Sequence, residues 1–153
     1  TMTPIIRVRR IGEHTLPVPS RATPFSAGLD LRNAGPRVTL FPRIDAVDAS
    51  EYVDASVAKE EKIRTGFAFA IPSGYCGLVL GRSGLAFNDG VVAFHIGLID
   101  SDYRGEIAVS LVNHGTEPFD IEPGDDREAP VAMHLADDGW VIRTYRDGSV
   151  NPA

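Results

Sequence analysis

The stretch that decides the fold is GLIDSDYRGEI, at residues 97–107. Asp100 follows two apolar residues, so its carboxylate is expected at the edge of a packed sheet, where it can act as a general base on water. Tyr103 offers a ring face to a sugar or a base. A tight turn that needs Asp and Gly for its geometry is the simpler interpretation. Two aspartates, an aromatic residue and an arginine between glycines are nevertheless more polar chemistry than a hairpin requires.

Two further polar stretches precede it in the chain. SAGLDL, at residues 26–31, places a glycine two residues before Asp30, which suggests a carboxylate held at a fixed place beside a closely approaching backbone. Taken alone, it is more simply a β-turn that carries a surface aspartate. GRSGLA, at residues 81–86, combines Arg82, the Ser83 hydroxyl and glycine-freed amides, which together suit a phosphate. A turn followed by a solvated arginine explains it equally well.

Around these stretches the chain alternates between short apolar runs and turn residues. Period-two patterns with Gly, Pro, Asn and Asp between them predict many short strands, and thus an all-β sandwich or barrel. The expected strands lie at residues 5–10, 37–41, 64–71, 77–80, 91–96, 106–113, 119–121, 131–135 and 140–145. We predict a single domain over residues 1–153, with a surface insertion at 44–62 that forms at most a short helix, and a mobile tail at 146–153.

Composition excludes several classes of protein. The 153 residues are 43% hydrophobic and 24% charged, with no apolar run long enough to cross a bilayer. The net charge of −6 argues against binding to duplex nucleic acid, whose partners are basic. Cys76 is the only cysteine, so there is no disulfide framework and no Cys–His zinc cluster. Without a signal-peptide pattern in residues 1–10, the expected compartment is the reducing cytoplasm.

Taken in order, the three polar stretches resemble the first three signature motifs of the trimeric dUTPase family. The third is similar to its counterpart over eleven consecutive residues, and the resemblance runs from about residue 5 to residue 125, interrupted by the insertion. It implies a dUTPase-like β-barrel or jelly-roll of short strands, assembled as a homotrimer. It also implies hydrolysis of dUTP, or of a 5-substituted dUTP, to the monophosphate and pyrophosphate. The related dCTP deaminases typically carry a different turn in place of residues 100–103.

The resemblance also implies how the triphosphate is held. Asp30 would contact the waters of a Mg²⁺ ion that the phosphates carry, with no direct protein ligand to the metal. Arg82, Ser83 and Gly84 of the second motif would bind phosphate. Arg127 is the remaining cation expected to bind substrate, from the region of the fourth motif. Such chemistry depends mainly on positioning and on charge stabilisation by metal and cations.

The third motif would supply the reacting water and the nucleoside contacts. Asp100 is expected to orient the water that attacks the α-phosphorus, and Tyr103 to stack on the deoxyribose and disfavour a 2′-hydroxyl. Main-chain groups of the preceding hairpin, at residues 91–97, would read the base. Gly97, Ile99 and His95 are the substrate-binding residues expected there. In the family this motif comes from a different subunit than the second motif.

Two departures from the family pattern leave an alternative open. The fourth motif is replaced by DREAP at residues 126–130, with Pro130 where a phosphate-contacting glutamine is expected. The fifth motif, a glycine-rich arm with an arginine and a phenylalanine, has no counterpart, because no phenylalanine follows Phe119. The alternative is a weakly active or non-catalytic nucleotide-sensing protein on the same fold, which contacts a protein partner through the insertion at 44–62.

Overall fold

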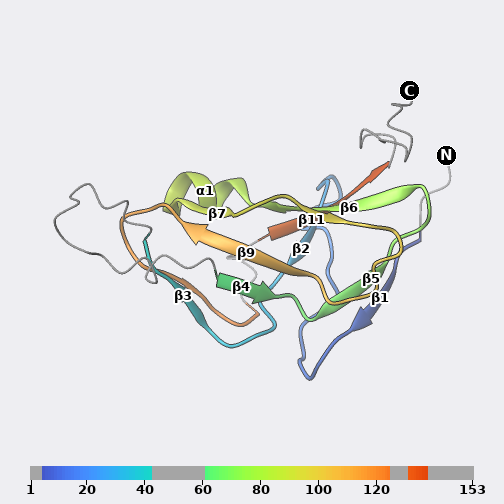
Figure 1. The fold of residues 1–153 in the computed structure, drawn as a ribbon, viewed down its shortest axis with the longest axis horizontal. Helices are drawn as coiled ribbons and strands as arrows, with labels where there is room; N and C mark the ends of the chain where they lie inside the picture. The colour runs from blue at the N-terminus through green and yellow to red at the C-terminus, as the bar shows by residue number, and fades with distance from the viewer. Residues whose placement is uncertain (1–4, 43–60, 125–130, 138–153) are drawn as a thin grey trace, which may run out of the picture.

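The computed structural model describes residues 5–42, 61–124 and 131–137. Within them the chain forms short strands and one helix, so the prediction of an all-β fold is confirmed (Figure 1). The helix α1 spans Ser83–Asp89 and lies beside β7. The strands are β1 Arg7–Arg10, β2 Leu29–Leu31, β3 Val38–Leu40, β4 Glu61–Arg64, β5 Phe67–Ala70, β6 Tyr75–Gly81, β7 Val91–Ala93, β8 Gly97–Ile99, β9 Ala108–Asn113, β10 Phe119–Ile121 and β11 Val131–Asp137.

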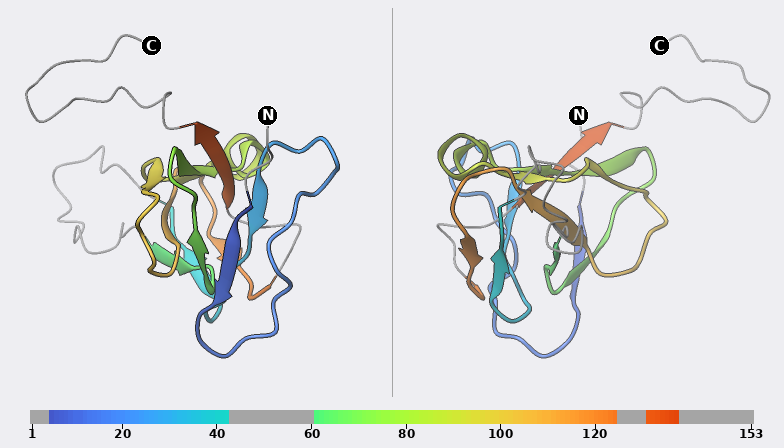
Figure 2. Two further views of the ribbon diagram at one scale, coloured as in Figure 1. Left: turned by 90° about the vertical axis from the view of Figure 1, so that its right-hand side faces the viewer. Right: turned by 60° about the vertical axis from the view of Figure 1, so that its left-hand side comes forward.

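The strands pair in four small antiparallel sheets. The largest has the order β2-β11-β6-β8, and a second has the order β4-β9-β7. The pairs β1-β5 and β10-β3 complete the set. Figure 2 shows these strands arranged around a common interior, while the long connection between β1 and β2 runs outside them along one side. This connection forms one wall of the candidate site.

The interior is one cluster of apolar side chains to which all four sheets contribute. The alternation expected of half-buried strands is clear in β6, where Val79 is buried between partly exposed leucines. Strand β5 departs from it, since three of its four residues are buried. The fully buried members include Leu31, Leu40, Ile63, Phe69, Val79, Leu111, Ile121 and Met133.

Two buried asparagines fix turns at the edge of this core. Asn113 is 2% exposed, and its amide donates to the carbonyls of Leu40 and Glu117 while its oxygen accepts from the Gly115 N–H. Asn33 makes the same three kinds of bond, to Pro36, Ile121 and Gly35. Every buried side-chain polar atom in the described ranges has a partner. Both asparagines therefore stabilise turns that join different sheets.

The structure corrects one boundary predicted from the sequence. Glu61 and Lys62, assigned to the insertion, are the first residues of β4 and pair with Leu111 and Ser110 of β9. The rest of the insertion, the fourth-motif region with Arg127, the expected strand at 140–145 and the tail at 146–153 lie outside the described residues. Across the described ranges, no helix has the length and apolar character needed to span a membrane.

Candidate active site

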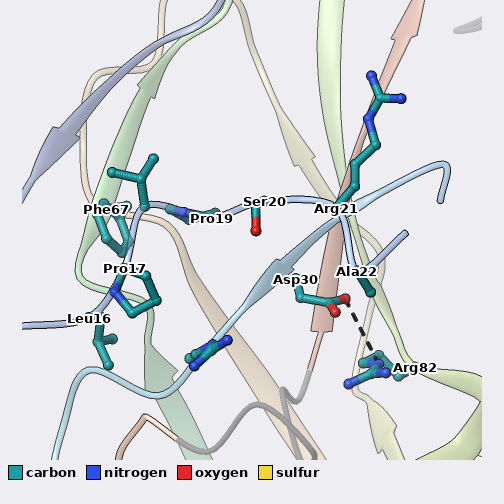
Figure 3. Close-up of a pocket in the computed structure, with 11 residues that line it drawn as sticks. Leu16, Pro17, Pro19, Ser20, Arg21, Ala22, Asp30, Phe67 and Arg82 are labelled. Carbon is teal, nitrogen blue, oxygen red and sulfur yellow. Dashed lines mark ion pairs between the residues drawn. The ribbon is translucent and has the colours of Figure 1, made fainter. Parts of the chain in front are cut away.

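Asp30 and Arg82 come together at the surface of the largest sheet. Asp30 lies in the middle of β2, and its neighbour Leu31 points into the core, so the carboxylate faces outward. Arg82 directly follows β6 and precedes α1. Strand β11 pairs with both β2 and β6, and the two side chains meet across it with 4.0 Å between Asp30 Oδ1 and Arg82 Nε (Figure 3). The first and second polar stretches thus form one site.

A pocket of about 350 Å³ surrounds this pair. One side is formed by residues 16–22 of the β1–β2 connection, which we call the pocket wall, and Phe67 of β5 lies beside Pro17 of this wall (Figure 3). Arg32, directly after the end of β2 and two residues after Asp30, also lines the pocket and donates to the Gly124 carbonyl at 3.2 Å. Sequence reasoning missed Arg32, although the period-two rule from Asp30 would have found it.

The charge of this pocket suits a polyanion. Among the lining residues that the structure describes, Asp30 is the only acidic side chain, against Arg32 and Arg82. Arg21 lines the pocket as well, but its side chain turns away from the ion pair in Figure 3 and donates to the Pro24 carbonyl. Guanidinium groups bind phosphate oxygens with charge-assisted hydrogen bonds. The described part of the lining thus carries more positive than negative side chains, on a protein whose net charge is −6.

A second hollow, of about 440 Å³, lies on the other side of Arg82. Its lining includes Ser83 at the start of α1 together with Phe94, His95 and Ile96 of the connection between β7 and β8. The hairpin expected at residues 91–97 does not form, because β7 pairs with β9 and β8 pairs with β6. The end of β7 lies close to the end of β6, since a Cβ on Gly81 would be 3.0 Å from the Ala93 nitrogen. Arg82 lines both hollows, so an elongated ligand that extends from one hollow into the other could contact this arginine along the way.

The third stretch forms a well-ordered turn after β8. The Tyr103 N–H donates to the Asp100 carbonyl at 3.1 Å, and Arg104 donates to the carbonyls of Ser101 and Tyr103. The Tyr103 hydroxyl donates to the Glu106 carbonyl at 3.1 Å, which fixes the ring against Gly105. A Cβ on Gly105 would lie 2.4 Å from that hydroxyl oxygen, so only glycine allows this placement. Asp100 is exposed, and Tyr103 is 44% exposed.

A single chain does not bring this turn to Asp30 and Arg82. Strands β6 and β8 are antiparallel, with Gly77 opposite Ile99 and Val79 opposite Gly97. Asp100 therefore lies beside the start of β6, whereas Arg82 follows its end. The level of Asp100 on β6 is six residues before Arg82. At about 3.3 Å per residue, Asp100 and Arg82 are therefore about 20 Å apart along the strand. Neither hollow that contains Arg82 includes Asp100 or Tyr103.

Comparison with known proteins shows which family the sequence is similar to. The sequence profile of the dUTPase family matches residues 14–129. A deoxyuridine 5′-triphosphate nucleotidohydrolase of Anaeromyxobacter is 42% identical over 123 residues, which cover 78% of this chain and 73% of that protein. One from Rhizobium rhizogenes is 40% identical over 113 residues, which cover 71% of this chain and 63% of that protein.

Solved structures carry the same fold. The dUTPase from phage phi11 of S. aureus superposes with a TM-score of 0.68 at 22% identity, covering 87% of this chain and 90% of the phage protein. The dUTPase of Staphylococcus bacteriophage 80alpha, solved as a point mutant with dUpNHpp, gives 0.68 at 20% identity over 88% and 91%. Since the family profile covers most of the described residues and the sequence relatives exceed 30% identity, this chain belongs to the dUTPase family.

Proposed function

We propose that this protein hydrolyses dUTP, or a 5-substituted dUTP, to the monophosphate and pyrophosphate. The observation that carries the proposal is the pocket in which Asp30 lies 4.0 Å from Arg82 and shares the lining with Arg32. Cations around one carboxylate suit a triphosphate that carries a divalent metal ion. The relatives at about 40% identity are named for this activity.

The triphosphate would lie beside Arg82, the residue that lines both hollows. Arg82 and Arg32 would neutralise phosphate oxygens, and the Ser83 hydroxyl would add a hydrogen bond. Gly84 has no heavy atom within 4 Å of the position that a Cβ would take, so its backbone is open to a ligand. Arg127 stays a prediction from the sequence, as it lies outside the described residues.

The residues fit a magnesium ion that arrives with the nucleotide. In the described ranges, no three His, Cys, Asp or Glu side chains are grouped to hold a metal. Asp30 instead offers a carboxylate that is 24% exposed beside the cations. Mg²⁺ keeps several waters and is commonly bound through one or two carboxylates and the substrate's phosphates. Asp30 would hold such waters, and the bound ion would neutralise charge that develops on the phosphate oxygens.

Asp100 would act on the attacking water. Its carboxylate would accept a proton as the water oxygen forms a bond to the α-phosphorus. The bond from that phosphorus to the oxygen bridging to the β-phosphate would break, and pyrophosphate would leave with the electron pair. The exposure of Asp100 and the hydrogen bonds that fix the backbone of its turn support this role, because the carboxylate is open to a substrate and starts from a fixed backbone position.

The same turn would select the sugar, and the chain that leads from β7 into β8 would select the base. The Glu106 carbonyl fixes the Tyr103 ring, and a ring fixed in this way can lie flat on a deoxyribose and leave no room for a 2′-hydroxyl. The backbone from His95 to Gly97, and Ile99 after it, would read the base. His95 is exposed and its Nδ1 lies 3.2 Å from the Ile96 carbonyl oxygen, which supports a structural place in the β7–β8 connection rather than a role in the chemistry.

A complete site would need more than one copy of the chain. Asp100 and Arg82 are about 20 Å apart along β6, a gap that two side chains of one chain cannot close. A closed ring of identical subunits can bring the third motif of one copy to the first two motifs of the next. A homotrimer, as the family resemblance implies, would meet this requirement.

Pyrophosphate release tests the proposed function. We expect turnover of dUTP or its 5-hydroxymethyl analogue with Mg²⁺, little turnover of dTTP, dCTP or UTP, and none in chelator. Asp100→Asn should abolish turnover, whereas Asp89→Asn, which changes an exposed carboxylate at the end of α1, should not. Normal turnover by Asp100→Asn would remove the water-activating role. The alternative of a non-catalytic partner-binding protein rests mainly on residues outside the described ranges, and no observation favours it.

A further inference from the structure

The pocket wall, residues 16–22, makes few hydrogen bonds to other residues that the structure describes. It belongs to no strand, and Pro17 and Pro19 have no N–H to donate. At its far end, the Ser20 carbonyl accepts from the Asp30 N–H at 3.2 Å. At its near end, Arg10 of β1 donates to the Leu16 carbonyl at 2.7 Å. Its position beside Asp30 thus depends on a few anchors at the two ends.

His14 is the other anchor at the near end, and its partners determine its tautomer. Nε2 lies 2.8 Å from the Gly66 carbonyl, which can only accept, so Nε2 must carry the proton. Nδ1 lies 2.9 Å from Arg10 Nη1 and 3.3 Å from the Leu16 nitrogen, both of which can only donate. Nδ1 must therefore be unprotonated, and the arrangement requires a neutral imidazole.

Close neighbours fix the position of the His14 ring. Gly66 has φ +74°, and a Cβ there would be 2.2 Å from His14 Nε2. The ring packs edge-on to Phe67, at 5.1 Å between centroids, and Phe67 lines the pocket. The charged groups around it are Arg10 on one side and Glu106, which accepts from the Gly66 N–H and pairs with Arg64, on the other. Glu13 adjoins it in the chain and is exposed.

We propose that neutral His14 is a positioning residue that holds the pocket wall against the phosphate site, and that protonation of its ring releases the wall. A proton on Nδ1 would face the Arg10 guanidinium and the Leu16 N–H, so both hydrogen bonds would be lost and two positive charges would be adjacent. This inference rests on the proposed function, because the wall borders Asp30 and Arg82. Binding should weaken as pH falls, while the chemical step, which uses Asp100, should not change through this route.

Kinetics of the full-length protein with dUTP test the proposal. Gln is the conservative variant, since its amide has an acceptor and a donor spaced like the two ring nitrogens but does not titrate. At about pH 8, His14→Ala should raise KM roughly tenfold with kcat nearly unchanged, and His14→Gln should restore KM to within about threefold of the wild type. Between about pH 8 and about pH 5.5, KM of the wild type should rise more steeply than KM of His14→Gln.

His114→Gln is the matched control, because His114 is exposed and contacts Gly90 through its backbone N–H. Its KM should follow the wild type at every pH. Equal pH profiles for the wild type and His14→Gln would overturn the proposal, as would an unchanged KM in His14→Ala.

Nitrogen-15 NMR of the imidazole rings gives a readout that is independent of activity. It should find His14 protonated at Nε2 alone at about pH 8, and a proton on Nδ1 at that pH would also overturn the proposal. Failure of the wild type to hydrolyse dUTP would instead count against the proposed function, and the NMR result would then still decide the state of the ring.

Discussion

The distance between Asp100 and Arg82 leads to a prediction about mixed trimers of two inactive variants. Arg82→Ala removes a phosphate contact, with a loss of roughly 100-fold or more in kcat. Asp100→Asn removes the proposed base, with a loss of roughly 1,000-fold. Each homotrimer should therefore be almost inactive. If a site combines Arg82 of one copy with Asp100 of the next, the two variants together can rebuild intact sites.

The magnitude follows from the geometry of a ring. The antiparallel register of β6 and β8 places the two residues about 20 Å apart in one chain, so every site would draw them from different copies. In a closed ring of three that contains both variants, one adjacent pair supplies an intact Arg82 and an intact Asp100 in the required order. Mixed trimers should thus recover about one third of the wild-type activity per trimer.

The assay uses two affinity tags, one on each variant, and purification through both tags after co-expression, so that only mixed trimers remain. Pyrophosphate release is then compared with the two parent homotrimers, and two differently tagged copies of Arg82→Ala serve as the control. Activity no higher than that of the parents would refute the shared site. A monomeric wild-type protein with full activity would refute it as well.

Three further outcomes are expected. Tyr103→Ala should raise the kcat/KM ratio of UTP to dUTP, whereas unchanged selectivity would remove the sugar-stacking role. Asn113→Ala leaves two carbonyls without their donor and should lower the free energy of unfolding by about 2–3 kcal/mol, measured with denaturant. Hydrogen bonds from Thr39 and Arg37 lower the pKa of Asp120, so this group stabilises the fold above its ordinary value of 3.8 and loses that effect as pH falls below it. The Tm advantage of the wild type over Asp120→Asn should accordingly vanish in acid; an advantage that persists there would contradict this account.

The strands and turns were predictable because their signals are local. Alternation at period two and the placement of Gly, Pro, Asn and Asp depend on neighbouring residues only. Residues 119–121 were predicted as a strand and form β10 with those bounds. The start of β4 at Glu61 was missed, because charged residues hide the pattern and the strand is defined by its pairing with Leu111 across the molecule.

The sequence by itself determined the all-β class, the family and the three polar stretches, because each depends on residue types at fixed spacing. Only the tertiary structure decided how these stretches combine. Pairing of β11 with both β2 and β6 joins Asp30 to Arg82, while the register of β8 on β6 keeps Asp100 about 20 Å away. The pocket wall and its His14 anchor likewise depend on contacts with Gly66, which is distant in the chain. Spacing along a sequence cannot specify such contacts, since they arise from which strands pair and in which register.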